Sequence, residues 1–395
     1  MRILVVSHNY PRFPGDPAGG YVARLARAAH AAGAKVWVVA PHTPGAASEE
    51  SDRGVPVCRF RYAPGLLERI GYRGDVRSRA FLSPLSLLVL PLYLTGFARA
   101  VRRAVAAFAP DLIHAHWWFP AGWVVAGAGM PFVLTCHGSD VRLLDRGVLF
   151  PRLARRVFGQ AGAVTTVSHF LAADIERHVP RLKRPVVVAP MPVEVDRFEA
   201  GAATPKARPP RILYAGNLLE SKGVDVLLRA LAILRERSIP CRLRVVGEGP
   251  ARGGLEALAR QLGIADAVEW SDFVPQDAMP AEYGASTITV LPTRGQAEGL
   301  GLVLVEALLA GSAVVGTPAG GIPEVVVDGE TGLLARDGDP QHLADQLARL
   351  LTDPALRARL TEAGMRRMRA TYSPAAAGGR FLALFDAIAR DHPAR

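Results

Sequence analysis

The chain has 395 residues, half of them hydrophobic, and a formal net charge of +11 at pH 7. This length exceeds one ordinary hydrophobic core and predicts two domains, while the apolar content excludes a largely disordered protein. The three cysteines (Cys58, Cys136 and Cys241) form no Cys-x-x-Cys pair, so neither a disulfide framework nor a cysteine metal site is expected, and a reducing cytoplasm is the predicted compartment.

Short apolar runs alternate with helix-length segments along the chain, which is the pattern of βα units on parallel sheets. In the first half, these runs predict strands at residues 3–7, 36–40, 57–61, 112–114, 132–136, 164–167 and 186–189. In the second half, they predict strands at residues 211–215, 242–246, 268–270, 288–291 and 313–316. The predicted fold class is α/β, with two Rossmann-like, doubly wound domains.

Five prolines between residues 190 and 210 indicate a domain boundary. We expect an N-terminal domain at residues 1–190, a linker at 191–210 and a second domain at 211–371. Within residues 372–395, the apolar spacing predicts one amphipathic helix that follows Ser373 and Pro374.

Two glycines stand between the first predicted strand and the helical segment that follows it. Gly19 and Gly20 either let backbone amides approach a diphosphate or form a plain turn, since they are not a complete dinucleotide-binding motif.

Histidines follow two neighbouring strands of the first half. His137 comes directly after the strand that ends at residue 136, and His116 lies near the end of the strand before it, so we expect both to reach a binding cleft. The alternative for His137 is a structural histidine whose hydrogen bonds are satisfied within the protein. His114 is expected to pack within its strand. Asp140 either faces the acceptor side of that cleft or caps the next helix. No carboxylate or cysteine lies at ligand spacing from these histidines, so no metal site is expected.

The net charge belongs entirely to the first half. Residues 1–200 carry 25 Lys and Arg against 14 Asp and Glu, whereas residues 201–395 carry 22 of each. Such a field attracts anions such as phospholipid surfaces and polyprenyl diphosphates, although genome composition also explains a high arginine content. No nucleic-acid-binding motif accompanies the charge, so a nucleic-acid partner is not expected.

Residues 81–97 form an uncharged stretch that is short for a membrane span and is interrupted by Pro84 and Pro91. It predicts a buried helix of the first domain or, as the alternative, a helix partly exposed at a membrane interface. Arg152, Arg155 and Arg156 either support such docking or form a solvated helix face.

The first strand of the second domain leads into a segment with glycine and lysine. Gly216 and Asn217 leave the strand, and Lys222 follows five residues later. We expect Lys222 to reach a diphosphate as a point charge, the alternative being a solvent-exposed lysine.

Glu298 and Glu306 bracket a glycine-rich entry into an apolar helix. Gly299, Leu300 and Gly301 are expected to direct free N–H groups at a phosphate. One carboxylate can then accept hydrogen bonds from a ribose and the other from the hydroxyls of a sugar. The alternative is an acid at a helix N-terminus and a solvated face residue. The pattern favours a nucleotide-sugar site.

Together with Gly320 and Gly321, these motifs resemble the donor site of the retaining GT-B glycosyltransferases, in particular glycosyltransferase family 4. The resemblance implies two Rossmann-like domains that face each other across a cleft, with the C-terminal helix crossing back to the first domain. It further implies transfer of a hexosyl group from a nucleoside diphosphate sugar to an acceptor hydroxyl, with retention of configuration and without a metal or other cofactor.

The resemblance also assigns roles to single residues. Glu306 would hold the ribose, Glu298 the sugar hydroxyls and Lys222 the departing diphosphate. His137 is similar to a histidine that contacts the donor sugar. The family usually has arginine where Asn217 stands, which puts the role of that position in doubt.

The acceptor is expected to be a saccharide or a lipid-linked saccharide of cell-surface or exopolysaccharide assembly, with the enzyme at the inner face of an anionic membrane. The only Asp-x-Asp pair, Asp337 and Asp339, is predicted to form a surface turn. Two alternatives remain open. A sugar-nucleotide epimerase would need no acceptor, and a degenerate nucleotide-sugar-binding regulatory protein would be expected to lack Lys222, Glu298 or Glu306.

Overall fold

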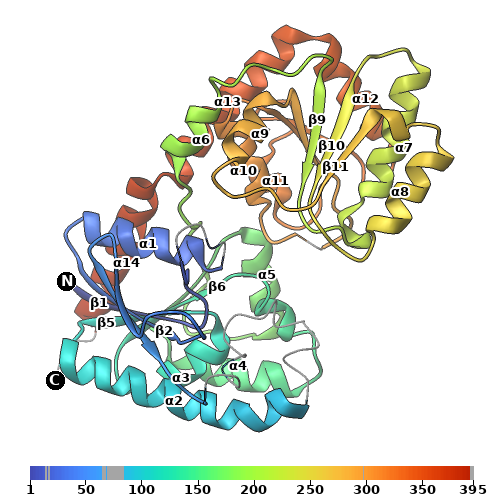
Figure 1. The fold of residues 1–395 in the computed structure, drawn as a ribbon. Coiled ribbons are helices and arrows are strands. Elements are labelled where there is room, and N and C mark those ends of the chain that lie inside the picture. The colour runs from blue at the N-terminus through green and yellow to red at the C-terminus, as the bar shows by residue number, and fades with distance from the viewer. Residues whose placement is uncertain (14–15, 17, 65–67, 69–83, 297, 392–395) are drawn as a thin grey trace. The chain divides into compact units, whose positions relative to one another are not determined.

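The computed structural model describes residues 1–13, 16, 18–64, 68, 84–296 and 298–391. Two compact units make up the chain (Figure 1). The first comprises Met1–Val193 together with Pro374–Arg395, and the second comprises Glu194–Ser373. The chain thus leaves the first unit once and returns to it for its last helix.

The first unit is built on an eight-stranded sheet with the order β3-β4-β2-β1-β5-β6-β7-β8. All neighbouring strands run parallel except β3 and β4, which form an antiparallel hairpin. The inner strands are buried on both faces, as strands covered by helices on both sides are. The strands are β1 (Arg2–Ser7), β2 (Lys35–Pro41), β3 (Glu49–Asp52), β4 (Val55–Phe60), β5 (Leu112–His116), β6 (Phe132–Cys136), β7 (Ala163–Thr166) and β8 (Val187–Val188).

Helices cover both faces of this sheet, with α1 and α14 side by side on one face and α2 and α3 on the other (Figure 1). The C-terminal helix belongs to the core, because Phe381 and Phe385 are fully buried with their ring centroids 5.3 and 5.0 Å from that of His114. The helices are α1 (Gly20–Ala31), α2 (Pro84–Phe108), α3 (Trp123–Val125), α4 (Leu149–Gln160), α5 (His169–His178) and α14 (Pro374–Asp391), with the short turns η2 (Trp118–Gly122) and η3 (Val141–Leu143).

The second unit has a six-stranded, fully parallel sheet with the order β11-β10-β9-β12-β13-β14. Helices α7, α8 and α12 lie on one face, and α9, α10 and α13 on the other (Figure 1). The strands are β9 (Arg211–Ala215), β10 (Arg242–Val246), β11 (Val268–Ser271), β12 (Ile288–Leu291), β13 (Ala313–Gly316) and β14 (Leu333–Leu334). The helices are α6 (Val195–Gly201), α7 (Val224–Glu236), α8 (Arg252–Gln261), α9 (Met279–Ala285), α10 (Leu302–Leu309), α11 (Ile322–Val325), α12 (Pro340–Thr352) and α13 (Pro354–Tyr372), with the turns η4 (Glu220–Lys222) and η5 (Ala265–Ala267).

Every strand predicted from the sequence is present, and the α/β prediction with two Rossmann-like domains is confirmed. Two strands were missed. β3 has the sequence Glu-Glu-Ser-Asp, which carries no apolar signal because it is an edge strand, and β14 pairs through only two residues.

The predicted linker at residues 191–210 was wrong for its central part. Residues 195–201 form helix α6 of the second unit, where Phe198 is buried and its ring centroid lies 6.1 Å from that of Tyr283 in α9. A Cβ on Gly201 or on Gly284 would overlap backbone atoms of the other helix, so these two glycines let α6 and α9 pack closely. The prolines therefore correctly indicated loops on both sides of α6, but they gave no sign of the helix between these loops.

Helix α2 contains most of the uncharged stretch at residues 81–97, of which residues 81–83 lie outside the described part. Contrary to the sequence interpretation, Pro91 does not interrupt this helix but lies within it, on its exposed side. Tyr93 and Phe97 are buried, whereas Leu88 and Leu92 are 75% and 54% exposed. The helix is therefore half buried and half exposed. None of the described helices is long and apolar enough to span a membrane.

Candidate functional site

In the second unit, loops at the carboxyl ends of β12 and β13 lie against each other through their backbones. A Cβ on Gly320 would overlap the carbonyl oxygen of Glu298, and a Cβ on Gly321 would overlap that of Gly299. The amide of Gly321 also donates to the carbonyl of Glu298 at 3.2 Å. Only glycine permits this approach, so Gly320 and Gly321 fix the backbone from which the Glu298 side chain projects.

The structure brings Lys222 and Glu298 together, although they are 76 positions apart. Lys222 Nζ lies 2.6 Å from Glu298 Oε2, with only 17% and 20% of the two side chains exposed. Gly223 ends η4 with φ 67°, and a Cβ there would overlap the carbonyl oxygen of Pro292. The turn η4, which carries Lys222, is thereby held against the loop that follows β12. The pair presents one cation and one carboxylate at the same place, the chemistry that an anionic leaving group and a polyol require.

Glu306 lies in the second turn of α10 and is oriented by a tyrosine of α9. The hydroxyl of Tyr283 donates to Glu306 Oε2 at 3.0 Å, and the ring is 1% exposed. Burial, and then the Glu306 charge and hydrogen bond, hold the pKa of Tyr283 well above its usual value, so it remains a donor at neutral pH. Sequence analysis missed Tyr283 because its spacing from Glu306 across two helices carries no local signal.

The predicted phosphate-binding segment enters α10 through a left-handed residue. Gly301 has φ 86° and ψ 48°, and the helix begins at Leu302. Gly299 and Leu300 belong to the preceding loop, with the Leu300 side chain buried. The amide of Leu304 in the first turn of α10 donates to the carbonyl of Gly301 at 2.9 Å, and the other amides of a first turn have no acceptor within the helix. Their binding of a phosphate stays a prediction.

A glycine pair after β10, which sequence analysis did not identify, braces the predicted Gly216 segment. A Cβ on Gly247 would overlap the carbonyl oxygen of Gly216, and one on Gly249 would overlap that of Leu218. These glycines closely follow a predicted strand. They could therefore have been identified in the same way as the glycines and polar residues that follow the other strands. The Asn217 side chain is exposed, and its role stays a prediction.

A second cation near Lys222 was also missed. Arg294 follows β12 and its amide donates to the carbonyl of Ser221 at 2.8 Å, while its guanidinium pairs with Asp225 at 2.5 Å. Because Arg294 closely follows a predicted strand, its position was visible in the sequence. Its carboxylate partner partly compensates its charge, which leaves Lys222 as the more direct candidate for a diphosphate.

The two carboxylates of the Asp-x-Asp pair accept hydrogen bonds from backbone amides. Asp339 caps α12 by accepting from the amide of His342 at 2.9 Å, and Asp337 accepts from the amide of Gly295 at 2.8 Å. Both carboxylates are thus used as loop anchors, consistent with the predicted turn. In the described part of the chain, no group of three or more His, Cys, Asp or Glu side chains is arranged to hold a metal ion.

In the first unit, the carboxyl ends of β1, β5 and β6 carry a cluster of rings. Nδ1 of His116 lies 3.0 Å from Nε2 of His137. Trp117 contacts both His8 and His137, with centroid distances of 4.3 and 4.5 Å. Trp117 has φ 66°, an unusual value for a residue other than glycine, and its indole donates to Ser139 Oγ at 3.1 Å. Sequence analysis brought His116 and His137 to one place correctly but missed His8 and Trp117.

The imidazoles of this cluster are neutral at physiological pH. Burial lowers the pKa of His8 and of His114 to about 3. Burial and the neighbouring histidines together hold the pKa values of His116 and His137 well below their usual range. The cluster therefore offers hydrogen bonds without charge.

Two interpretations of this region need correction. His116 is 1% exposed, so it contacts His137 and does not itself reach a cleft, while His114 packs within its strand as expected. Asp140 is fully buried and accepts from the amides of His137, Gly138 and Trp118 at 2.9, 3.2 and 3.0 Å. It neither faces an acceptor nor caps its own turn. The carboxylate instead fixes the loop that carries His137.

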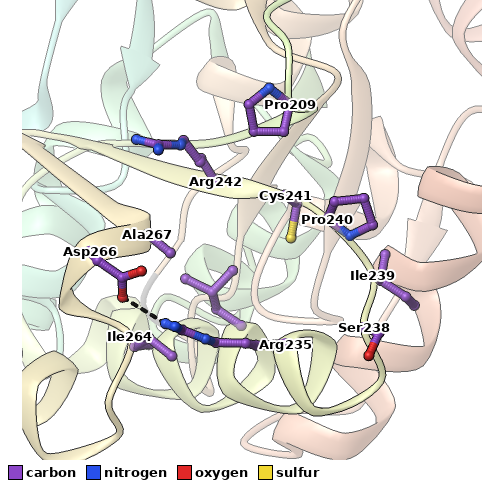
Figure 2. A pocket seen from close by; sticks show the side chains of 11 residues that line it. Pro209, Arg235, Ser238, Ile239, Pro240, Cys241, Arg242, Ile264, Asp266 and Ala267 are labelled. Carbon is purple, nitrogen blue, oxygen red and sulfur yellow. Dashed lines mark hydrogen bonds and ion pairs between the residues drawn. The ribbon is translucent and has the colours of Figure 1, made fainter.

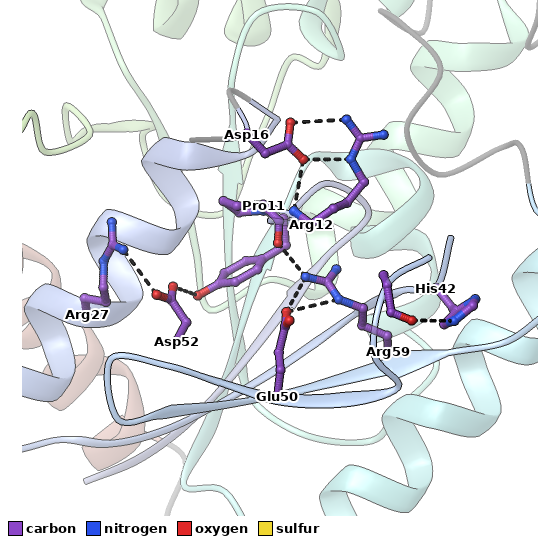
Figure 3. Close-up of polar contacts among 10 residues, drawn as sticks. Pro11, Arg12, Asp16, Arg27, His42, Glu50, Asp52 and Arg59 are labelled. Atoms are coloured by element: carbon purple, nitrogen blue, oxygen red, sulfur yellow. Dashed lines mark hydrogen bonds and ion pairs between the residues drawn. The ribbon is translucent and has the colours of Figure 1, made fainter. Parts of the chain in front are cut away.

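The loop after β1 is held by the hairpin that sequence analysis missed (Figure 3). Tyr10 donates to Asp52 of β3 at 2.8 Å, and Arg27 of α1 lies 3.2 Å from the same carboxylate. Arg59 of β4 donates to the carbonyl of Pro11 and to Glu50. The hairpin thus supplies polar anchors for the residues between β1 and α1.

The two predicted glycines of this loop differ in their surroundings. A Cβ on Gly19 would overlap the backbone of Asn9, and its φ of 66° also favours glycine. A Cβ on Gly20 would lie 3.4 Å from the Arg24 side chain, an acceptable distance. Packing alone explains Gly19, and diphosphate binding by either glycine stays a prediction.

The pocket in Figure 2 lies at the opposite end of the second sheet from the loops above, beside residues that precede β10. It has a volume of about 350 Å³ and contains Cys241, whose pKa burial raises to about 11, and the Arg235–Asp266 pair at 2.6 Å. Because this thiol stays protonated at neutral pH, the pocket holds no ready nucleophile.

Solved structures of GT-B glycosyltransferases share this fold of two Rossmann-like units. Sucrose-phosphate synthase from Thermosynechococcus elongatus matches with a TM-score of 0.78 and 23% identity, over 99% of this chain and all of that one. HepE from Anabaena, in complex with UDP, matches with a TM-score of 0.71 and 19% identity, over 98% of this chain and all of that one. The fold is GT-B.

Sequence comparison identifies the family. The model of Glycosyltransferase Family 4 matches residues 18–197, and that of Glycosyl transferases group 1 matches residues 196–367. A D-inositol 3-phosphate glycosyltransferase of Acidothermus cellulolyticus is 32% identical over 400 residues, covering 90% of this chain and 84% of that protein. One of Streptomyces avermitilis is 34% identical, covering 70% of this chain and 66% of that protein. The chain belongs to glycosyltransferase family 4 and is a glycosyltransferase of GT-B type.

Proposed function

We propose that this enzyme transfers a hexosyl group from a nucleoside diphosphate sugar to an acceptor hydroxyl, with retention of configuration and without a metal ion. The observation that carries the proposal is the partly buried Lys222–Glu298 pair on a glycine-braced backbone. HepE, which shares the fold, is described in complex with UDP and with UDP-glucose, which supports a nucleotide-sugar donor.

The pair suggests how donor binding proceeds. In its absence Lys222 and Glu298 neutralise each other. A bound diphosphate competes for the lysine, and Glu298 is then released to accept hydrogen bonds from sugar hydroxyls. Glu306, which Tyr283 orients, accepts hydrogen bonds from the ribose. The charge that develops on the departing diphosphate is stabilised by Lys222 and the α10 amides. We assign no protein nucleophile, because the leaving phosphate oxygen can take the acceptor proton.

A screen of nucleoside diphosphate sugars tests the donor class. We expect one or a few of them to raise the melting temperature and to be hydrolysed slowly without acceptor. Transfer to an added acceptor, with no new sugar nucleotide formed from donor alone, separates a transferase from an epimerase. If no nucleotide-sugar stabilises the protein or is turned over, the proposal fails.

We also propose that the acceptor is lipid-linked and that the first unit docks on an anionic membrane. Val148 and Leu149, before and at the start of α4, are 74% and 61% exposed, and exposed arginines surround them in the sequence. These are Arg146, Arg152, Arg155 and Arg156. An apolar tip with a basic rim is a combination that binds the interface of anionic bilayers.

Liposome co-sedimentation tests the membrane proposal. Each arginine near the surface contributes about 1 kcal/mol, so binding is expected at low salt and is expected to weaken as salt rises. Reversal of Arg152, Arg155 and Arg156 to glutamate is expected to abolish it. The matched control reverses three exposed arginines of α13 (Arg359, Arg366 and Arg367) and is expected to bind normally. Equal binding by both triple variants, or none by the unaltered enzyme, favours a soluble acceptor.

A further inference from the structure

A contact between two histidine rings bears on which nitrogen of His137 carries its proton. Nδ1 of His116 lies 3.0 Å from Nε2 of His137, the ring planes differ by 17°, and the centroids are 5.2 Å apart. Nearly parallel planes at this separation fit a bond within a common ring plane. One ring therefore donates and the other accepts.

Because both rings are neutral, each has one N–H group and one bare nitrogen. Two arrangements satisfy the contact. In the first, His116 donates through Nδ1, and the proton of His137 is on Nδ1. In the second, His137 donates through Nε2, and the proton of His116 is on Nε2.

The second nitrogen of His116 distinguishes the two arrangements. Its Nε2 is buried without a hydrogen-bond partner in the described part of the chain, and the residue is 1% exposed. In the second arrangement this nitrogen would be an unpaired buried N–H, which is rarer in proteins than an unpaired acceptor. The first arrangement is therefore favoured.

The surroundings of His137 keep its ring in place. The centroids of Trp117 and Tyr21 lie 4.5 and 4.8 Å from that of His137, and the buried Asp140 carboxylate accepts from its amide at 2.9 Å. With Nε2 engaged by His116, only Nδ1 is available to a ligand.

We propose that His116 is a positioning residue that holds His137 in the Nδ1–H tautomer, so that His137 donates a hydrogen bond to an oxygen of the bound sugar. That the ligand is a sugar rests on the function proposed above; the tautomer does not. A histidine that donates without charge recognises a hydroxyl or ring oxygen, whereas it adds no Coulombic attraction for phosphate.

Long-range ¹H–¹⁵N spectra of histidine-labelled protein distinguish the two tautomers. We expect the Nδ1–H form at both His116 and His137. His116→Phe keeps a ring but removes the donor. We expect it to move His137 toward the Nε2–H form and to lower kcat about tenfold, the effect of one lost hydrogen bond.

His116→Asn places an amide nitrogen near the position of Nδ1, so it is expected to restore the Nδ1–H form of His137 and most of the lost turnover. His30→Phe, at the exposed end of α1, is the matched control and is expected to leave the His137 signals unchanged. Melting temperatures of all variants separate lost positioning from lost folding.

An Nε2–H tautomer of His137 in the unaltered protein overturns the proposal, whatever the enzyme transfers. So does an unchanged tautomer in His116→Phe. A switched tautomer with undiminished turnover shows that the His137 proton does not contact the substrate, which also overturns it. Failure of the function itself would appear separately, as absence of nucleotide-sugar binding and turnover in the unaltered protein.

Discussion

The strand-end loops of the two units differ in how they handle charge. In the second unit they present ionised groups, Lys222 and Glu298, with Glu306 nearby on α10. In the first unit they present neutral imidazoles and an indole, among which His137 and Trp117 are in contact. We infer that the second unit supplies the charged groups of the proposed reaction, for the diphosphate, the ribose and the sugar hydroxyls, and that the first unit supplies neutral hydrogen-bond donors. The same Rossmann-like scaffold supports both, because the strand-end residues and not the sheets set the chemistry.

The largest effect on turnover is expected from a substitution among the charged residues of the second unit. Lys222→Gln removes the cation while keeping a donor of similar length. We expect kcat to fall about 10²–10³-fold, because a charged donor to the transition-state oxyanion is lost. Steady-state kinetics measures this, with the exposed Arg366→Gln of α13 as control. A loss of less than a few-fold would remove Lys222 from the reaction.

Glu306 is expected to matter for binding rather than for chemistry. Glu306→Ala should weaken nucleoside diphosphate binding by about 1.5–3 kcal/mol, since a charged hydrogen-bond acceptor is lost. Tyr283→Phe removes only the group that orients Glu306, so the loss should be about 0.5–1.5 kcal/mol. Calorimetry measures both. Equal affinity of Glu306→Ala and the unaltered enzyme for every nucleotide would contradict the assignment.

The neutral cluster predicts a pH dependence of stability. The folded pKa values of His114 and His116 are depressed, so between about pH 6.5 and their folded pKa values the unfolded chain binds more protons. The free energy of unfolding should fall as pH decreases below about 6.5, by about 1.4 kcal/mol per pH unit for each histidine.

Urea unfolding followed by tryptophan fluorescence checks this prediction. Four of the five tryptophans (Trp37, Trp117, Trp118 and Trp123) belong to the first unit. Replacement of both histidines by asparagine should reduce the slope, and His8 and His137, whose pKa values are also lowered, should account for the rest. Identical stability of the unaltered protein at about pH 5 and about pH 7 would show that the cluster is not neutral in the folded state.

The smallest expected effect is that of a chelator. If Lys222 and helix amides stabilise the diphosphate, EDTA should leave turnover unchanged. If EDTA abolishes activity and magnesium or manganese restores it, a metal ion helps Lys222 to stabilise the charge of the diphosphate.

The sequence predicted most of this architecture, for reasons that particular elements make clear. β12 and β13 were predictable because strands buried on both faces are uninterrupted apolar runs. The edge strand β3 was not, because an acidic edge strand has no such pattern. The structure shows α6 where prolines suggested a linker, because burial of Phe198 depends on α9, more than eighty residues later.

The candidate site was predictable where residues follow strands and unpredictable where they meet across elements. Lys222, Glu298 and His137 each follow a strand, so their general location was evident. Their partners were not. The Tyr283–Glu306 bond and the anchoring of the loop after β1 by Asp52 depend on tertiary packing, which no local spacing encodes. The same holds for Asp140, which was expected to face an acceptor or to cap a helix but is buried and accepts hydrogen bonds from backbone amides.

Equilibrium binding of nucleotides that differ only in phosphate number tests the central claim most directly. If Lys222 is the cation for the diphosphate, the unaltered enzyme binds the nucleoside diphosphate much more tightly than the corresponding nucleoside, and Lys222→Gln loses most of that difference while its affinity for the nucleoside stays the same. A variant that discriminates between the two as well as the unaltered enzyme does would contradict the account.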